Sequence, residues 1–249
     1  MAAMSTAGIL IIGNEILSGK VQDENTPYFL RELRTQGVDV RAVHVVPDEI
    51  ERIADEVRGF SARFDYVLTS GGVGPTHDDL TMDGVALAFG VDLVIHAEMA
   101  DQLRKALRGS EPNASQLKMC MLPRGAGLIS TPDLWFPLVH VRNVYIFPGI
   151  PRLLQAKFES ARGCFKGQPF FLRRVYVRCM ESDIAQDLHD LLADFPELLL
   201  GSYPRTTARA SESDYLTMLT LESRDEQYVL RAVDALVARI PGGALLKVD

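Results

Sequence analysis

The sequence predicts an α/β fold, a three-layer sandwich around a mostly parallel sheet, followed by a small α+β domain. In the first 160 or so residues, short apolar runs typical of buried parallel strands alternate with helical patterns. Strands and helices that alternate with short links form a parallel sheet covered on both faces. After the apolar-poor segment 163–169, the order changes to β-α-β-β-α-β. We therefore place the two domains at 1–166 and 167–249.

The first domain opens with three apolar runs, expected as strands over 7–12, 38–46 and 66–69. A helix is expected to start at Asn25, because Pro27 follows in the first turn, and to end at Gly37. The next helix follows Asp48, where apolar residues recur at i, i+3, i+4 and i+7. Its apolar positions are Ile50, Ile53, Ala54 and Val57.

In the rest of the first domain, the sequence predicts two helices, a polar loop, a hairpin and a final helix. A helix over about 80–89 ends at Gly90, and a second helix covers 98–108. Residues 109–115 are polar and are expected to form a loop. A hairpin is expected from two short apolar runs, and a helix follows it at Pro151. The hairpin strands are 136–140 and 143–147.

The second domain is predicted from alternating strand and helix patterns of its own. The expected strands are 171–179, 197–203, 214–222 and 244–248, and the expected helices are 182–193 and 226–239. The polar residues 206–213 between the two central strands are expected to form a mobile loop.

Composition and charge exclude several classes of protein. Lys and Arg number 26 against 33 Asp and Glu, so the formal charge of −7 argues against nucleic acid as the main partner. Three widely spaced cysteines match neither a disulfide framework nor a zinc site. No basic segment precedes the apolar run at residue 9, and no run reaches the ~18 residues of a membrane helix. We expect a cytoplasmic protein without a membrane partner.

The block SGGVGPTHDDLTMD, residues 70–83, is the strongest candidate site. A strand ends there, three glycines follow within four residues, and a helix begins. Glycine allows positive φ and close approach of a ligand, and free N–H groups in such a loop can hold phosphate. The alternative is a tight turn with Asp78 or Asp79 as the helix cap. The candidate phosphate-binding residues here are Ser70, Gly71, Gly72, Gly74 and Thr76.

Paired carboxylates beside a phosphate loop indicate a divalent metal, since hard cations bind carboxylate oxygens and bridge to phosphates. We expect Asp79 as the inner ligand and Asp78 as the weaker candidate. Glu15 follows the first strand and is either a further ligand or a solvated loop residue. Asp48 follows the second strand and, with Glu51 three residues on, also fits a capping box.

Other loops are expected at the same edge of the sheet, where the carboxyl ends of parallel strands meet. Gly13, Asn14 and Ser18 follow the first strand, and Gly149 follows the second hairpin strand. These four residues are candidates for nucleotide binding. The five histidines show no metal-ligand spacing, although His77 lies within the glycine-rich loop.

Three strings carry a resemblance to a known family: GNEILSGKVQDENTPYFLRELRTQGVDV, VVPDE and TSGGVGPTHDDLT. They resemble the molybdopterin-binding (MoaB/Mog-like) domain family. Within it, the chain is similar to the N-terminal domain of competence/damage-inducible protein A. The strings FPLVHVRNVYIFPGIP and LGSYP are similar to the N-terminal molybdopterin-binding-like (FAD hydrolase) domain of eukaryotic FAD synthase. The resemblance extends from about Gly8 to the end.

The resemblance implies a ligand site at the glycine-rich loop, with functional aspartates at Asp48 and Asp79. In the competence-protein and FAD-synthase branches it implies a metal-dependent pyrophosphatase. Such an enzyme splits FAD or ADP-ribose to mononucleotides with Co²⁺ or Mg²⁺ as the divalent metal, together with K⁺. It also implies a homo-oligomer. The alternatives are molybdopterin binding or adenylylation, with a pterin phosphate as ligand, and a non-catalytic nucleotide-binding module.

One segment departs from the family pattern. The family's usual NPVGTAPG-like segment is replaced by STPDLWFPLVH, beginning at Ser130. Because that segment normally borders the site, the departure at 130–137 bears on substrate choice.

Overall fold

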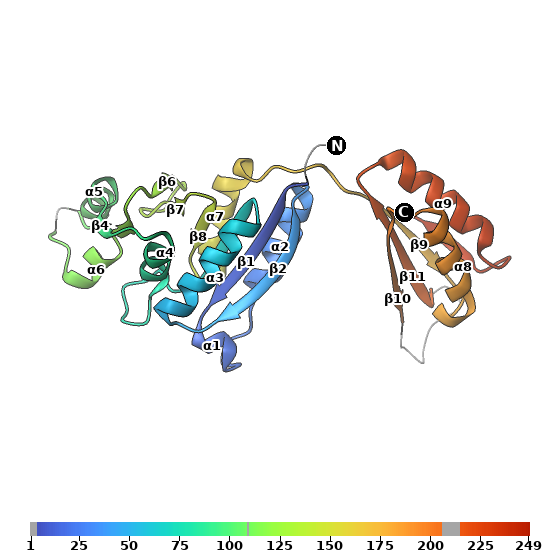
Figure 1. The fold of residues 1–249 in the computed structure, drawn as a ribbon, viewed down its shortest axis with the longest axis horizontal. Helices are drawn as coiled ribbons and strands as arrows, with labels where there is room; N and C mark the ends of the chain where they lie inside the picture. The colour runs from blue at the N-terminus through green and yellow to red at the C-terminus, as the bar shows by residue number, and fades with distance from the viewer. Residues whose placement is uncertain (1–3, 109, 206–214) are drawn as a thin grey trace. The chain divides into compact units, whose positions relative to one another are not determined.

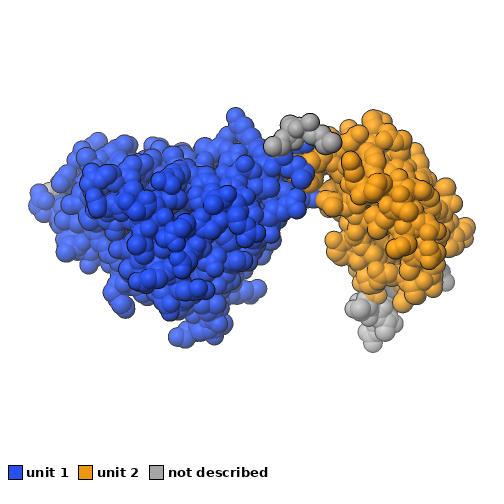
Figure 2. Space-filling model, viewed as in Figure 1, with its two compact units in different colours: residues 1–168 blue, residues 169–249 orange. Residues whose placement is uncertain are grey.

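A computed structural model describes residues 4–108, 110–205 and 215–249. The chain divides into two compact units, Met1–Gln168 and Pro169–Asp249 (Figures 1 and 2). The sequence placed the boundary between residues 166 and 167. The loop expected over 206–213 lies outside the described residues.

The first unit is built on a six-stranded sheet of mostly parallel strands (Figure 1). Its order is β2 (Asp39–Val46), β1 (Thr6–Ile12), β3 (Tyr66–Ser70), β8 (Val144–Phe147), β7 (Leu138–Val141) and β6 (Gly127–Ile129). The first four strands are parallel, and β7 and β6 continue the sheet antiparallel. The predicted α/β class is therefore confirmed.

Helices cover both faces of this sheet. The helices of this unit are α1 (Asn14–Leu17), α2 (Asn25–Thr35), α3 (Ile50–Arg63), α4 (Thr81–Phe89), α5 (Ala97–Ala106), α6 (Ala114–Lys118) and α7 (Pro151–Ala161), and a 3₁₀ turn η1 (Arg162–Cys164) follows. Phe29 of α2 and Phe158 of α7 pack in one core cluster, whereas Ile53 of α3 and Val85 of α4 pack in another. The sheet separates the two clusters.

The strand β1 shows why the central runs are apolar throughout. Successive side chains of a strand point to opposite faces of its sheet. Ile9 and Ile11 join the cluster of α2 and α7, while Leu10 and Ile12 join the cluster of α3 and α4. A strand covered on both faces must be apolar at every position, which is the pattern that predicted it.

Three short strands and the short helix α6 were not predicted from the sequence. The strands β4 (Leu93–Ile95) and β5 (Met121–Pro123) pair antiparallel in a small sheet, and the third strand, β6, extends the main sheet. The loop expected over 109–115 is wrong at its end, because α6 begins at Ala114. Asn113 and Gln116 form a reciprocal capping box that starts this helix.

The second unit is an antiparallel sheet with the order β10-β11-β9-β12. Its elements are β9 (Phe171–Val177), α8 (Glu181–Asp194), β10 (Leu199–Pro204), β11 (Thr217–Ser223), α9 (Glu226–Arg239) and β12 (Leu245–Val248). Leu191 of α8 and Leu236 of α9 share one core with Val175 and Leu219 of the strands. This is the β-α-β-β-α-β order expected. No helix among the described residues of the chain is long and apolar enough to cross a membrane.

Candidate active site at the carboxyl edge of the parallel sheet

The carboxyl ends of β3 and β8 are joined through the side chain of Asn25. This buried residue lies at the start of α2, and its Nδ2 donates to Ser70 Oγ at 2.9 Å and to the Gly149 carbonyl at 2.7 Å. The Asn25 Oδ1 is buried without a hydrogen-bond partner among the described residues. The sequence marked Asn25 only as a helix start, so its link between two strand ends was missed. The structure therefore places Ser70 and Gly149 together, as the topology predicted.

The glycine-rich loop needs glycine for two separate reasons. Gly71 has φ +107°, and a Cβ there would lie 2.0 Å from the Ile12 carbonyl oxygen. A Cβ on Gly74 would lie 2.7 Å from an Asp79 carboxylate oxygen. The first glycine lets the loop pass close to the end of β1. The second leaves space in which the Asp79 carboxylate folds back over the loop.

Thr76 binds both aspartates that follow it. Its N–H donates to Asp79 Oδ2 at 2.8 Å, and its Oγ1 lies 2.5 Å from Asp79 Oδ2 and from Asp78 Oδ1. The hydrogen bond from the Thr76 hydroxyl, with a second from backbone N–H, lowers the pKa of Asp78. The alternative role of these aspartates as a helix cap is wrong, because Leu80 caps α4 without a side-chain bond.

Lys118, the last residue of α6, holds the same loop from the other side. Its Nζ donates to the Thr76 carbonyl and, at 3.0 Å, to the Asp79 carbonyl. This places a cation beside two carboxylates at the loop that we expect to bind phosphate. Lys118 lies 39 residues beyond Asp79, and no motif or spacing in the sequence connects the two.

Asp48 supports the loop that follows β1. Its Oδ2 accepts a hydrogen bond of 2.8 Å from the Asn14 N–H. The capping-box alternative is wrong, because Glu49 occupies the cap position of α3 and no side chain bonds there. The N–H of Gly13 also has a partner, the Val46 carbonyl at 3.1 Å. The backbone donors of Gly13 and Asn14 are thus engaged within the protein.

Glu15 and Ser18 complete this loop. The Ser18 hydroxyl donates to the Glu15 carbonyl at 3.3 Å. The Glu15 carboxylate folds against Gly13, where a Cβ would lie 2.5 Å from its Oε1. Glu15 also lines the larger of the two cavities described below.

This larger cavity, called here the loop cavity, has a volume of about 640 Å³. It lies at the strand ends and brings together residues from the loops after β1, β3 and β8. Seven predicted site residues line it: Glu15, Ser70, Gly71, Gly72, Gly74, Asp79 and Gly149. Six others do not line it: Gly13, Asn14, Ser18, Asp48, Thr76 and Asp78. The side chains of Asp48, Thr76 and Ser18 instead form hydrogen bonds within the loops, and neighbouring residues of these loops line the cavity.

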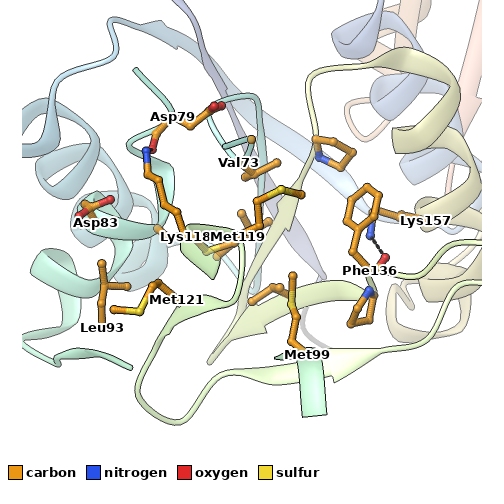
Figure 3. A pocket seen from close by; sticks show the side chains of 17 residues that line it. Val73, Asp79, Asp83, Leu93, Met99, Lys118, Met119, Met121, Phe136 and Lys157 are labelled. Atoms are coloured by element: carbon orange, nitrogen blue, oxygen red, sulfur yellow. Dashed lines mark hydrogen bonds between the residues drawn. The ribbon is translucent and has the colours of Figure 1, made fainter. Parts of the chain in front are cut away.

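A second cavity of about 260 Å³, called here the apolar cavity, adjoins the first (Figure 3). Gly72, Gly74 and Asp79 line both cavities. The other walls of the apolar cavity are largely methionine, valine, leucine and proline side chains with Phe136. The glycine-rich loop therefore borders both cavities.

Lys157 of α7 also lines the apolar cavity. Its side chain is buried, with the residue 1% exposed, and its Nζ donates to the Phe136 carbonyl at 2.6 Å. The same nitrogen lies 3.9 Å from the centre of the Phe136 ring, as Figure 3 shows from close by. Burial lowers the pKa of Lys157 from 10.5 to about 7. The sequence analysis did not single out this residue.

A divalent metal would need ligands beyond those that the chain supplies. Among the described residues, no group of three His, Cys, Asp or Glu side chains is arranged to hold a metal ion. Asp78 and Asp79 lie close together, because the same Thr76 hydroxyl contacts both. Magnesium is commonly held by one or two carboxylates together with substrate phosphates and water. The site therefore fits a cation that binds together with a phosphate ligand.

Comparison with known proteins gives relatives for both units. Residues 8–162 match a family described as "Probable molybdopterin binding domain", and residues 169–249 match "FAD synthase, middle domain". A protein of Archaeoglobus fulgidus is 32% identical over 90% of this chain and 93% of its own length. The probable FAD synthase of Caenorhabditis elegans is 30% identical over 97% of this chain and 51% of its own length. The chain thus spans about half the length of that relative.

A solved structure supports the fold of the first unit. The protein CinA of Thermoplasma acidophilum, whose function is given as unknown, matches with a TM-score of 0.61 and 30% identity. The match covers 65% of this chain and 98% of that structure. Since the family match spans more than half of the sequence and includes every residue of the site described above, the chain belongs to the molybdopterin-binding domain family.

Proposed function

We propose that this protein hydrolyses the pyrophosphate bridge of a dinucleotide such as FAD or ADP-ribose, and releases two mononucleotides. The position of Asp79 carries the proposal. Its carboxylate lies over Gly74, and the residue lines the loop cavity and the apolar cavity alike. A pyrophosphate bound at the glycine-rich loop would lie beside this carboxylate.

The loop offers donors for the phosphate oxygens. The N–H groups of Gly72, Val73 and Gly74 make no hydrogen bond within the described part of the chain. Successive free N–H groups of this kind form an anion-binding concavity. We expect them, with the Lys118 cation, to bind the two phosphates and to stabilise charge that develops during the reaction.

Hydrolysis adds one water across the bridge. A new P–O bond forms to the water oxygen, the bridging P–O bond breaks, and the departing phosphate takes up a proton. Asp79 is placed to orient the attacking water and to accept its other proton. A divalent cation, when bound with the substrate phosphates, would neutralise their charge and make water more acidic. Asp78 and Asp79 would hold it, with Glu15 as an additional carboxylate.

The comparisons support FAD as a substrate class. Both units of this chain align in one stretch with the probable FAD synthase of C. elegans, and the second unit matches the FAD synthase middle domain. Asp48 holds Asn14 and does not line the loop cavity. We therefore propose Asp48 as a positioning residue for the loop after β1.

The first test is release of FMN and AMP from FAD, with ADP-ribose in parallel and with Co²⁺ or Mg²⁺ plus K⁺. We expect metal-dependent turnover by the wild type and a loss of at least 100-fold in kcat for Asp79→Ala, because one charge-stabilising group is removed (about 2.7 kcal/mol or more). Asp101→Asn is the matched control, since Asp101 is exposed on α5 and lines neither cavity. It should leave turnover unchanged.

The absence of turnover for both dinucleotides, from folded protein with metal, would contradict the proposal. Binding of a pterin phosphate at the same loop would then be the leading candidate, which the family description favours. A titration with that ligand would separate it from a non-catalytic nucleotide-binding module. We also propose that the protein forms a homo-oligomer, which light scattering coupled to gel filtration measures directly.

A further inference from the structure

A groove of about 330 Å³ is formed by residues of α5 and of the segment 130–137. Lys105 of α5 lines it together with Thr131 and Trp135 of the segment. Of the residues that line this groove, Pro137 also lines the apolar cavity, and none lines the loop cavity. The volume falls within the range of small-molecule sites. The groove is therefore a candidate binding site with residues of its own.

The groove has a cation in its wall and no carboxylate. Lys105 is exposed, and its ammonium group makes no hydrogen bond or ion pair within the described part of the chain. No Asp or Glu is among the described residues that line the groove. The nearby carboxylates of α5 have partners, since Asp101 binds Arg104 at 2.9 Å and Glu98 accepts from the Gln102 amide at 3.2 Å. An anion in the groove would therefore meet an unpaired positive charge.

Thr131 adds a hydroxyl without a partner to the opposite wall. The residue is 5% exposed, and its Oγ1 has no hydrogen-bond partner among the described residues. A buried hydroxyl without a partner is unfavourable, because folding removes it from water and returns no hydrogen bond. Thr131 lines the groove, so an acceptor atom bound there is a candidate partner. The neighbouring Asp133 is exposed and does not line the groove.

Trp135 gives the groove an apolar, aromatic wall. The residue is half-buried and lines the groove together with Leu134 and Pro137. Its ring centre lies 5.3 Å from that of Phe136, so one side of the indole packs within the segment. Aromatic side chains bind other rings by stacking or by edge contacts. A ligand that joins a ring to an anionic group would match Trp135, Lys105 and Thr131 at once.

We propose that this groove binds a small organic anion, an aromatic ring that carries one carboxylate or phosphate group. Lys105 attracts the anionic group, Thr131 donates a hydrogen bond to it, and Trp135 packs against the ring. The groove uses none of the residues that line the loop cavity and none that the proposed hydrolysis requires. The two proposals can therefore hold or fail separately.

Trp135 is the single tryptophan of the chain, so its fluorescence reports on the groove. Phenylacetate and phenyl phosphate are titrated into the full chain in separate experiments, and the uncharged phenylacetamide is the control ligand. We expect a saturable change with at least one anion, with a Kd of about 1 mM for a ligand this small. Phenylacetamide should bind about threefold more weakly than phenylacetate, because it lacks the charge. The anion that binds more tightly identifies the preferred acidic group.

Two variants test the residues named. Lys105→Met keeps most of the side-chain length and removes the charge, so affinity for the anion should fall about threefold. Thr131→Val keeps the shape and removes the hydroxyl, and affinity should fall about fivefold. Its thermal stability should not fall, since the hydroxyl has no hydrogen bond to lose within the described chain. Lys166→Met is the matched control, because Lys166 is exposed and lines neither the groove nor the two cavities.

The outcomes that would overturn the groove site are specific. One is the absence of a saturable change with either anion at about ten times the expected Kd. Another is equal affinity for phenylacetate and phenylacetamide. A fluorescence change that stays the same in Lys105→Met, Thr131→Val and Lys166→Met would place the ligand elsewhere and would also overturn it. Hydrolysis of FAD, or its absence, bears on the proposed function alone.

Discussion

At the scale of single residues, Lys157 is the side chain whose environment differs most from its ordinary one. The apolar positions of α7 recur at Leu154, Phe158 and Ala161, and Lys157 lies on the same buried stripe. A charged residue on an apolar stripe of a helix is a visible sequence signal. Charged residues are almost never fully buried unless they are paired, so the position calls for a particular explanation.

Lys157→Met tests the cost of that burial through pH. The pKa of Lys157 falls from 10.5 to about 7 in the folded protein, so between these values the unfolded chain binds more protons than the folded one. The burial cost is therefore full below pH 7 and disappears as pH approaches 10.5. We expect Lys157→Met to be about 1–3 kcal/mol more stable than the wild type at pH 7 and equal to it near pH 10.5.

Urea unfolding of both proteins at several pH values from 7 to 10 measures this difference. Other groups titrate alike in the two proteins, so the difference between their stabilities isolates Lys157. A variant that is less stable than the wild type at pH 7, or a difference that does not change with pH, would contradict the assignment.

The site residues fell into those that the sequence could identify and those it could not. Ser70, Gly71, Gly72, Gly74 and Asp79 were predicted because a strand, a glycine cluster and a carboxylate pair are contiguous. Asn25 and Lys118 reach the same site from 45 and 39 residues away, through contacts that only the folded chain creates. These two residues were missed because they lie far along the chain from the loop, and the sequence does not show which distant residues the fold brings to it.

At the scale of elements, long periodic segments were predicted well and short ones were not. The strands and helices of the parallel core have repeating apolar positions that reveal them. The strands β4, β5 and β6 have three residues each, too few for a period to appear, and they exist because a distant partner pairs with them. The helix α6 was missed because its capping box lies in a stretch of polar composition.

The contact between α2 and the strand ends is an element-scale feature that a single substitution can test. Asn25→Ala removes both hydrogen bonds that join α2 to β3 and β8, and the buried Ser70 hydroxyl loses its donor. We expect a loss of about 1–3 kcal/mol in the free energy of unfolding, measured with urea. FAD binding should weaken as the ends of β3 and β8 separate.

Thr26→Ala is the control for this substitution. The Thr26 hydroxyl is buried without a hydrogen-bond partner in the described residues, so its removal breaks no such bond. The free energy of unfolding of Thr26→Ala should lie within about 0.5 kcal/mol of the wild-type value. Equal losses for the two variants would show that packing at the start of α2, and not the hydrogen bonds of Asn25, holds the strand ends.

At the scale of the whole molecule, the two units have separate cores. The buried clusters of the first unit contain no residue of the second, and the cluster of the second contains none of the first. All residues that line the loop cavity and the apolar cavity lie between Ile11 and Lys157. Folding and ligand binding of the first unit should therefore be properties of its own residues.

This separation predicts that residues 1–168 and 169–249, expressed apart, each unfold cooperatively. We expect the fragment 1–168 to hydrolyse FAD with a kcat/KM close to that of the full chain, since every cavity residue is retained. Calorimetry of both fragments and FMN release by the first one measure this. A folded fragment 1–168 that has lost activity would mean that residues 169–249 contribute to catalysis, and the full chain would then be the smallest active unit.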